Sequence, residues 1–277
     1  MVIHLPPPLL HVSVGSIFTQ CVQGCQDKGR RAALMECLPP VIKDSEDYAS
    51  KMPDNIASFA GSPLPAGVSG KTLSKLYKEN FAAETAPGRQ YYETILHQPK
   101  LDICPICGVR TVRTLDHYLP KSKYPTLAVT PLNLVPCCRD CNFDKLTYTI
   151  TTAESAPLHP YFDDISKERW LAVNVYSDKS VLYYAACPSA WPDTLKRRVE
   201  RHLSLYKLQI IYGSNAAQEI DDSIHLWRNL RRSANAVPLK EHLAEIRDSA
   251  EANNLNSWKS ALYRGLVEQF TTVETWL

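Results

Sequence analysis

Two short cysteine pairs, Cys104-Pro-Ile-Cys107 and Cys138-Arg-Asp-Cys141, decide how the centre of this chain folds. Each pair has the Cys-x-x-Cys spacing of a knuckle that presents two thiolates to a metal ion, and four such thiolates complete a tetrahedral structural zinc site. Gly108 follows the first pair, where a knuckle requires a tight turn. The pattern predicts a structural Zn²⁺ held by Cys104, Cys107, Cys138 and Cys141.

Other uses of the cysteines fit the sequence less well. The chain has nine cysteines in 277 residues, and an odd number argues against the disulfide framework of a short secreted scaffold. Cys137 adjoins Cys138, but only Cys138 has the x-x spacing to Cys141. The 30 residues between the two pairs exceed the roughly 15–20 of a plain zinc ribbon, so we expect a folded insertion between the knuckles.

Composition indicates a globular chain, with 44% hydrophobic residues and a mean hydropathy of −0.25. No stretch approaches the roughly 18–20 apolar residues of a membrane span. The segment from Met1 to Gly15 lacks the basic start of a signal peptide. We therefore expect a cytoplasmic protein without a membrane partner. The net charge of +2 does not by itself indicate nucleic-acid binding.

The chain divides into three predicted regions: a helical region over 1–98, a core over 99–165 and a second helical region over 166–277. In the first, a short helix is expected over 30–38, ended by Pro39-Pro40, and another helix opens at Ser69 and continues to Phe81. Beyond about residue 190, apolar residues recur at intervals of three to four, which is typical of the buried faces of helices.

The residue pattern of the core differs from that of both flanking regions. Residues 110–115 alternate and are rich in Thr and Val, which predicts a short strand ending at Asp116-His117. Four prolines between Tyr118 and Pro136 exclude a long helix there. A second strand near Leu134-Val135 and a helix from Cys138 would complete a ββα unit around a metal. The expected fold class is α+β, a mostly helical chain with a small central ββα core.

Within this core, Asp116, His117 and Asn142 are candidates for chemistry. The carboxylate of Asp116 and the carboxamide oxygen of Asn142 are hard donors suited to Mg²⁺ or Mn²⁺. Histidine has an ordinary pKa of about 6.5, so His117 can take a proton from water at neutral pH. Hydrolysis of a phosphodiester requires such a base together with neutralisation of the developing negative charge. A structural role for His117, one of eight histidines, is the plainer alternative.

Basic residues outnumber acidic ones, seven to four, between Lys100 and Lys145. The excess suits contact with phosphates, although a solvated surface explains it nearly as well. The candidate nucleic-acid contacts are Lys121, Lys123, Arg139 and Lys145. A second cluster at Lys196-Arg197-Arg198 could track a duplex backbone or could form the exposed face of a helix.

The segment from Cys104 to Lys145 resembles the zinc-knuckle branch of the HNH endonuclease family. The residues that carry the resemblance are the two cysteine pairs, Leu115-Asp116-His117, the run from Pro131 to Pro136, Asn142 and Lys145. Where many members of the family have a final histidine, this chain has Asn142, which makes it an H-N-N variant. The resemblance covers about 42 residues of 277.

The resemblance implies a metal-dependent endonuclease that hydrolyses DNA, with His117 as the base and Asp116 and Asn142 as ligands of a catalytic cation. It also implies that Asn133 hydrogen-bonds across the loop and orients His117. Family members with large helical flanks serve in anti-phage defence or restriction, some beside a separate ATPase. The resemblance therefore permits a similar setting and partner for this chain.

Two other classes of function compete with this reading. A non-catalytic zinc module that binds nucleic acid or a protein partner would have the same cysteines, with Asp116 and His117 incidental. A zinc-dependent nucleobase deaminase would need a His-x-Glu motif, and the sequence has none. The deaminase is therefore excluded, and the non-catalytic module remains the alternative.

Overall fold

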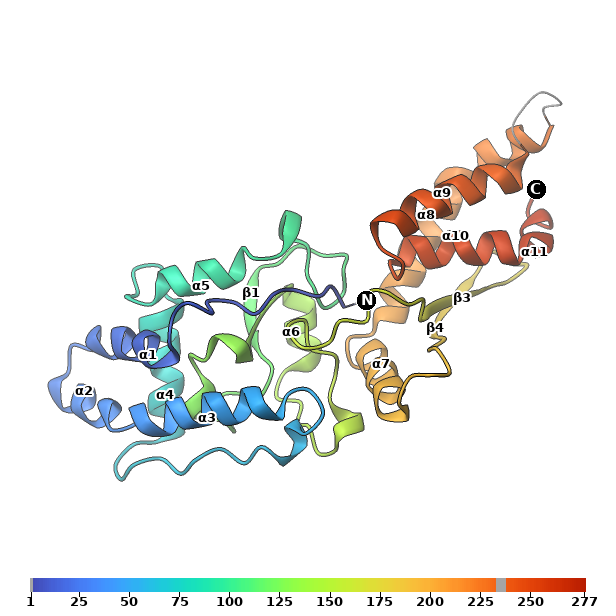
Figure 1. Cartoon of the computed structure of the whole chain (residues 1–277). Coiled ribbons are helices and arrows are strands. Elements are labelled where there is room, and N and C mark those ends of the chain that lie inside the picture. Colours follow the sequence, from blue (N-terminus) through green and yellow to red (C-terminus); the bar gives the residue numbers. More distant parts are fainter. Residues whose placement is uncertain (1, 233–237) are drawn as a thin grey trace. The chain divides into compact units, whose positions relative to one another are not determined.

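The structure is a computed structural model that describes residues 2–232 and 238–277. The chain forms two compact units, which cover residues 2–164 and 165–277 (Figure 1). The predicted helical region 1–98 and almost all of the predicted core 99–165 lie within the first unit. Met1 and residues 233–237 belong to predicted helical regions but lie outside the described residues.

The first unit contains several short helices, and three of them begin at a residue whose side chain caps the helix. The hydroxyl of Ser13 accepts from the amide of Ser16, and Asp27 and Ser69 cap two further helices in the same way, because each satisfies a backbone N–H that has no partner inside the helix. The helices are α1 Val14–Gln23, α2 Lys28–Met35, α3 Leu38–Lys51, α4 Gly70–Leu76 and α5 Arg89–Leu96.

Pro39 and Pro40 start a helix, and the prediction that they end one is wrong. Helix α2 ends at Met35, and both prolines lie in the first turn of α3. Proline is tolerated there because the first N–H groups of a helix have no intrahelical acceptor and because the ring presets a helical φ. The prolines therefore separate two helices by opening the second.

The middle of the chain forms the predicted strand, loop, strand and helix. Strand β1, Thr114–His117, pairs antiparallel with β2, Leu134–Cys137, so that Asp116 faces Val135 and His117 faces Leu134. Helix α6 follows at Arg139–Lys145. β1 begins later than the predicted strand, since residue 111 only forms an isolated bridge with Ile103. The α+β class is confirmed.

The two-stranded sheet lies against the helices of the same unit. Leu115 and Leu134 are buried and belong to the apolar core that α1 to α5 build. Helix α5 contacts both strands, while α6 contacts β1 (Figure 1). Burial of one such side chain stabilises the fold by about 1.5–3 kcal/mol. This packing fixes the end of β1, where Asp116 and His117 lie.

The second unit contains a β-hairpin, which the prediction of a helical region over 166–277 did not include. Strands β3 Leu171–Val175 and β4 Val181–Ala185 pair antiparallel and contact α10 and α8, respectively. The helices are α7 Asp193–Leu205, α8 Leu208–Arg232, α9 Leu239–Asn253, α10 Trp258–Glu268 and α11 Phe270–Glu274. Across residues 2–232 and 238–277, no helix has both the length and the apolar character needed to cross a membrane.

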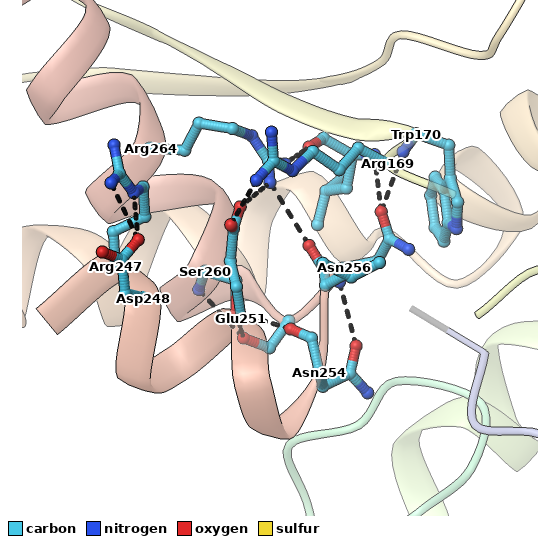
Figure 2. Close-up of polar contacts among 12 residues, drawn as sticks. Arg169, Trp170, Arg247, Asp248, Glu251, Asn254, Asn256, Ser260 and Arg264 are labelled. Atoms are coloured by element: carbon cyan, nitrogen blue, oxygen red, sulfur yellow. Dashed lines mark hydrogen bonds and ion pairs between the residues drawn. The ribbon is translucent and has the colours of Figure 1, made fainter. Parts of the chain in front are cut away.

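A buried polar network joins the turn between α9 and α10 to the start of β3 (Figure 2). The guanidinium of Arg264 contacts Glu251 and donates to the carbonyl of Leu171, both at 2.5 Å. The carboxamide of Asn256 accepts from the amides of Trp170 and Leu171. Because these buried groups satisfy one another, the network ties elements together that lie some 85 residues apart in the sequence.

Substitution of Gly265 by alanine should destabilise the second unit. A Cβ atom at this position of α10 would lie 2.4 Å from Cγ1 of Val173 and 3.2 Å from its carbonyl oxygen. Helix and strand would have to separate, and such overpacking costs about 1–3 kcal/mol. Chemical denaturation of the full chain measures the change in the free energy of unfolding.

Gly213→Ala provides the matched control in the same unit. Gly213 lies inside α8, and its added Cβ would lie 3.8 Å from its nearest neighbour, the carbonyl oxygen of Val181. Because alanine favours helix over glycine by about 1 kcal/mol, this variant should unfold at an equal or higher denaturant concentration. Equal stability of both variants would contradict the close packing of α10 on β3.

Candidate metal centre and adjoining cavity

Four cysteines from the two knuckles converge in the first unit. The sulfur atoms of Cys104, Cys107, Cys138 and Cys141 all lie within 4.8 Å of one another, and all four side chains are buried. A tetrahedral zinc with bonds of about 2.3 Å would place its sulfurs about 3.8 Å apart. The cluster therefore has the donor type and the approximate spacing of a closed metal site, as the sequence predicted.

Local backbone structure explains why these sulfurs meet. In the first knuckle, the amide of Gly108 donates to the carbonyl of Cys104 at 2.7 Å, and Gly108 has a φ of +65°, which favours glycine. In the second, Cys138 is the N-cap of α6, and its sulfur accepts from the amide of Cys141. The knuckles are thus a glycine turn and a helix start.

Cys137 lies outside this group of four. It ends β2, and its neighbour Cys138 supplies the ligand instead. Burial raises the pKa of the Cys137 thiol well above its ordinary value, with a further contribution from the nearby Asp116. The assignment of Cys138 rather than Cys137, which the sequence left to spacing, agrees with the geometry.

A cavity of about 310 Å³ lies at the end of β1, and one of its lining residues, Asn142, directly follows Cys141 in the sequence. Asp116, His117 and Asn142, which the sequence singled out, all line it. The other residues that line it are Ser74, Leu115, Pro120, Lys121, Ser122, Leu146 and Thr147. The structure therefore brings the three candidates for chemistry to one cavity.

His117 is almost fully buried, and its two ring nitrogens differ. Nε2 lies 2.9 Å from the carbonyl oxygen of Ala128, so this nitrogen carries the proton and donates. For Nδ1, the described part of the chain provides no hydrogen-bond partner. Burial lowers the pKa of His117 to about 3, with the positive charge of Lys121 acting in the same direction. The ring is therefore neutral, with an available lone pair on Nδ1.

Asp116 forms a buried ion pair with Lys145. The ammonium lies 2.9 Å from Oδ2 of Asp116 and donates to the carbonyl oxygen of His117 at 2.7 Å. Burial raises the pKa of the Asp116 carboxyl above its ordinary value, and the charge of Lys145 opposes that shift. Lys145 is 2% exposed, so its ammonium is committed to β1 and is not free to contact a phosphate in this structure.

Asn133 fastens the loop that follows β1. Its side-chain oxygen accepts from the amide of Leu119 at 2.7 Å, and its nitrogen donates to the carbonyls of Leu119 and Leu127. Leu127 precedes Ala128, whose carbonyl accepts from His117. Asn133 therefore makes no direct hydrogen bond to His117, but it holds both ends of the loop segment that does.

The remaining candidate contacts differ in exposure. Arg139 and Lys123 are exposed, and Lys123 donates to the hydroxyl of Thr149. Lys121 is partly buried and lines the cavity. In the second unit, Arg198 is 1% exposed, so the suggested duplex-tracking cluster at 196–198 cannot present all three side chains to a phosphate backbone.

His159 is fully buried among aromatic rings. Its Nδ1 accepts from the amide of Tyr161, and its Nε2 lies 3.1 Å from the hydroxyl of Tyr48. Both ring nitrogens therefore have partners inside the protein. This arrangement supports a structural role for His159.

Comparison with known proteins gives one informative match. No protein-family model matches the chain, and no solved structure matches it. The chain is 30% identical over 210 residues to Protein ea31 of Escherichia phage lambda, a match that covers 70% of this chain and 71% of that protein. The chain belongs to the family of Protein ea31.

A continuous match over 70% of the chain cannot leave out its centre, so the similarity to ea31 includes the segment from Cys104 to Lys145. The name ea31 describes no activity. The residues of the site itself are therefore the basis for inferring the chemistry of this ea31-family chain.

Sequence reasoning missed two residues of the N-terminal helices, one that lines the cavity and one that contacts His117. Ser74 of α4 lines it, and the ring of Tyr77 contacts His117 with a distance of 4.5 Å between ring centroids. The sequence shows both only as parts of an amphipathic helix. Their place beside β1 depends on packing between segments about 40 residues apart, which local spacing does not reveal.

The metal centre can be tested by exchanging single cysteines. Purified wild-type protein should contain about one tightly bound metal ion per chain. Cys138→Ser removes a ligand, so metal content by mass spectrometry should fall and the first unit should lose several kcal/mol of stability, on the order of the coupling between structural metal and folding. Cys137→Ser, the neighbouring control, should retain the ion. Loss of the ion from Cys137→Ser but not from Cys138→Ser would assign the fourth ligand to Cys137.

Because Lys145 and Asp116 form a buried ion pair, replacing Lys145 by a neutral residue should strongly lower the free energy of unfolding. Lys145→Met leaves a buried carboxylate without its partner, which costs about 3–5 kcal/mol in the free energy of unfolding. Lys123→Met, at an exposed position, should change it by less than about 0.5 kcal/mol. Denaturant titration of both variants checks this expectation, and coincident unfolding curves would show that the pair contributes little.

Proposed function

We propose that this ea31-family chain is a metal-dependent HNH endonuclease that hydrolyses DNA phosphodiester bonds. The observation that carries the proposal is the meeting of Asp116, His117 and Asn142 at one cavity, where Asn142 directly follows Cys141 of the four-cysteine centre. All three residues lie in the segment from Cys104 to Lys145 that resembles the HNH family.

The four cysteines would hold Zn²⁺ in a structural role. Four thiolates and no open position are typical of sites that stabilise a fold and do not catalyse. All four sulfurs are shielded from solvent, so a substrate could not reach the ion. The chemistry is therefore assigned to the cavity and not to the zinc.

His117 would act as the general base. Its Nε2–H is fixed by the carbonyl of Ala128, which orients the ring and leaves the lone pair of Nδ1 to accept a proton from a water molecule. The loop that carries Ala128 is in turn held by Asn133. A base that is already oriented loses little entropy when the water and the phosphate arrive.

Asp116 and Asn142 would hold the catalytic Mg²⁺ or Mn²⁺. They offer one carboxylate and one carboxamide oxygen at the same cavity, and Mg²⁺ uses few protein ligands because it retains water and binds substrate phosphate. When bound, the cation supplies positive charge that offsets the charge developing on the phosphate. The ammonium of Lys145 occupies one side of the carboxylate and would add a second positive charge nearby.

Lys121 is the basic residue best placed to meet a phosphate inside the cavity, while Lys123 and Arg139 are exposed for contact with the DNA backbone. Contacts of this kind fix the position of a duplex without reading its sequence. The proposed substrate is therefore DNA without a stated sequence preference. A setting in anti-phage defence or restriction, and a separate ATPase partner, stay predictions of the resemblance alone.

A cleavage assay with purified variants tests the proposal. His117→Ala should fold, keep its zinc and bind DNA, while cleavage of supercoiled plasmid falls by roughly 10²–10⁴-fold because the base is lost. Asp116→Asn, which leaves Lys145 a hydrogen-bond partner, and Asn142→Ala should instead raise the Mg²⁺ or Mn²⁺ concentration needed for activity. Asn133→Ala should lie between wild type and His117→Ala, since it loosens the loop that orients the base.

His97→Ala is the matched control, because His97 is an exposed histidine of the same unit and lies outside the cavity. It should cleave like wild type. Chelation by EDTA should stop wild-type cleavage, and added Mg²⁺ or Mn²⁺ should restore it. If His117→Ala cuts DNA as fast as wild type, the catalytic assignment fails and a non-catalytic zinc module becomes the better description.

A further inference from the structure

Tyr77 links the N-terminal helices to the cavity through an irregular stretch of helix. Helix α4 ends at Leu76 and passes directly into a π-helical turn, Tyr77–Ala82. Such turns are rare and are found frequently at functional sites, where they change the direction of a side chain. The first residue of this turn is Tyr77, and its side chain is buried.

The ring of Tyr77 is itself held firmly from behind. Phe81, one helical turn further on, stacks on it with ring centroids 5.6 Å apart and an interplanar angle of 25°. Phe81 is fully buried and contacts the ring of Tyr92 in α5. Tyr77 is therefore part of the rigid apolar core and not a mobile side chain that happens to lie near the cavity.

The other side of Tyr77 meets both residues that the proposed reaction needs in place. Its ring makes a T-shaped contact with the imidazole of His117, with an interplanar angle of 71° and 4.5 Å between centroids. The ammonium of Lys121 lies 5.2 Å from the centroid of the same ring, within the range of a cation–π contact. One ring therefore touches the candidate base and the candidate phosphate-binding cation.

A ring contact is needed at His117 because its hydrogen bonding is incomplete. The single bond from Nε2 to Ala128 fixes one atom of the imidazole but leaves the ring free to tilt about it. An edge-to-face contact restrains that tilt and so fixes the direction of the Nδ1 lone pair. Lys121, a long side chain with several rotatable bonds, gains a preferred position over the same ring.

We propose that Tyr77 is a positioning residue. Its ring holds the His117 imidazole and the Lys121 ammonium in fixed positions relative to each other. The proposal rests on the nuclease function proposed above for the part that concerns catalysis. The aromatic ring carries the effect, and the phenolic hydroxyl is not required.

Two substitutions at Tyr77 separate the ring from the hydroxyl. Tyr77→Leu removes the aromatic face and should lower kcat for DNA cleavage by roughly 10²-fold, the scale of a small misplacement of a catalytic group. It should also raise KM, because Lys121 loses its preferred position. Tyr77→Phe keeps the ring and should retain kcat and KM close to wild type. Zinc content should be unchanged in both variants.

Tyr91→Leu controls for a general loss of packing. Tyr91 lies in α5 of the same unit, packs against the same apolar core and does not line the cavity. Its kcat should stay near that of wild type. A wild-type kcat in Tyr77→Leu, or an equal loss in Tyr77→Phe, would overturn the positioning role.

Nuclear magnetic resonance of the His117 imidazole tests positioning without any cleavage. In wild type and Tyr77→Phe, the ring protons of His117 should show the shift caused by a neighbouring aromatic ring, and the Nε2 proton should exchange slowly. Both features should be lost in Tyr77→Leu. If wild type fails to cut DNA but this pattern appears, the nuclease proposal fails and the positioning role of Tyr77 stands. If wild type cuts DNA but the His117 signals are unchanged in Tyr77→Leu, the positioning role fails and the nuclease proposal stands.

Discussion

The ammonium of Lys145 lies between the last turn of α6 and the end of β1, where it contacts the carboxylate of Asp116 and the carbonyl of His117. A charge so completely removed from water is stable only with close partners, since the cost of desolvation amounts to several kcal/mol per ion. The pair therefore fixes the distance between helix and strand. Asp116, His117 and Asn142 share one cavity because that distance is fixed.

The four-cysteine centre acts on the opposite end of the same helix. Cys138 caps α6 and Cys141 lies in its first turn, so a bound metal would tie the helix start to the knuckle that precedes β1. A helix of 7 residues is too short to be stable alone. Metal at one end and an ion pair at the other give α6 the stability that its length does not provide.

Local sequence patterns sufficed to predict the central fold. The cysteine spacing, the prolines between Tyr118 and Pro136 and the residues around Asp116 specify strand, loop, strand and helix within a short stretch, where each signal is local. Asn133 and His117 also lie where the pattern indicated, although His117 donates its hydrogen bond to the carbonyl of Ala128 and makes none to Asn133.

The errors arose where distant packing decides the outcome. Strands β3 and β4 lie in a region that was predicted helical, and they are held by α8 and α10, with Gly265 permitting the close approach. Lys145 was predicted to contact nucleic acid, but it is buried and paired with Asp116. Lysine is rarely buried unless it is paired, and this partner could not be recognised from spacing. Tyr77 reaches His117 through a π-helical turn that the apolar pattern does not distinguish from an ordinary helix.

The length of α6 has a consequence for which sequences can keep this arrangement. Cys141 and Lys145 are four positions apart, so both face inward on the same side of the helix. One inserted or deleted residue between them would turn the lysine by about 100° around the helix axis. A metal ligand and the ion pair could then not be satisfied together, so the spacing between Cys141 and Lys145 does not tolerate a change in length.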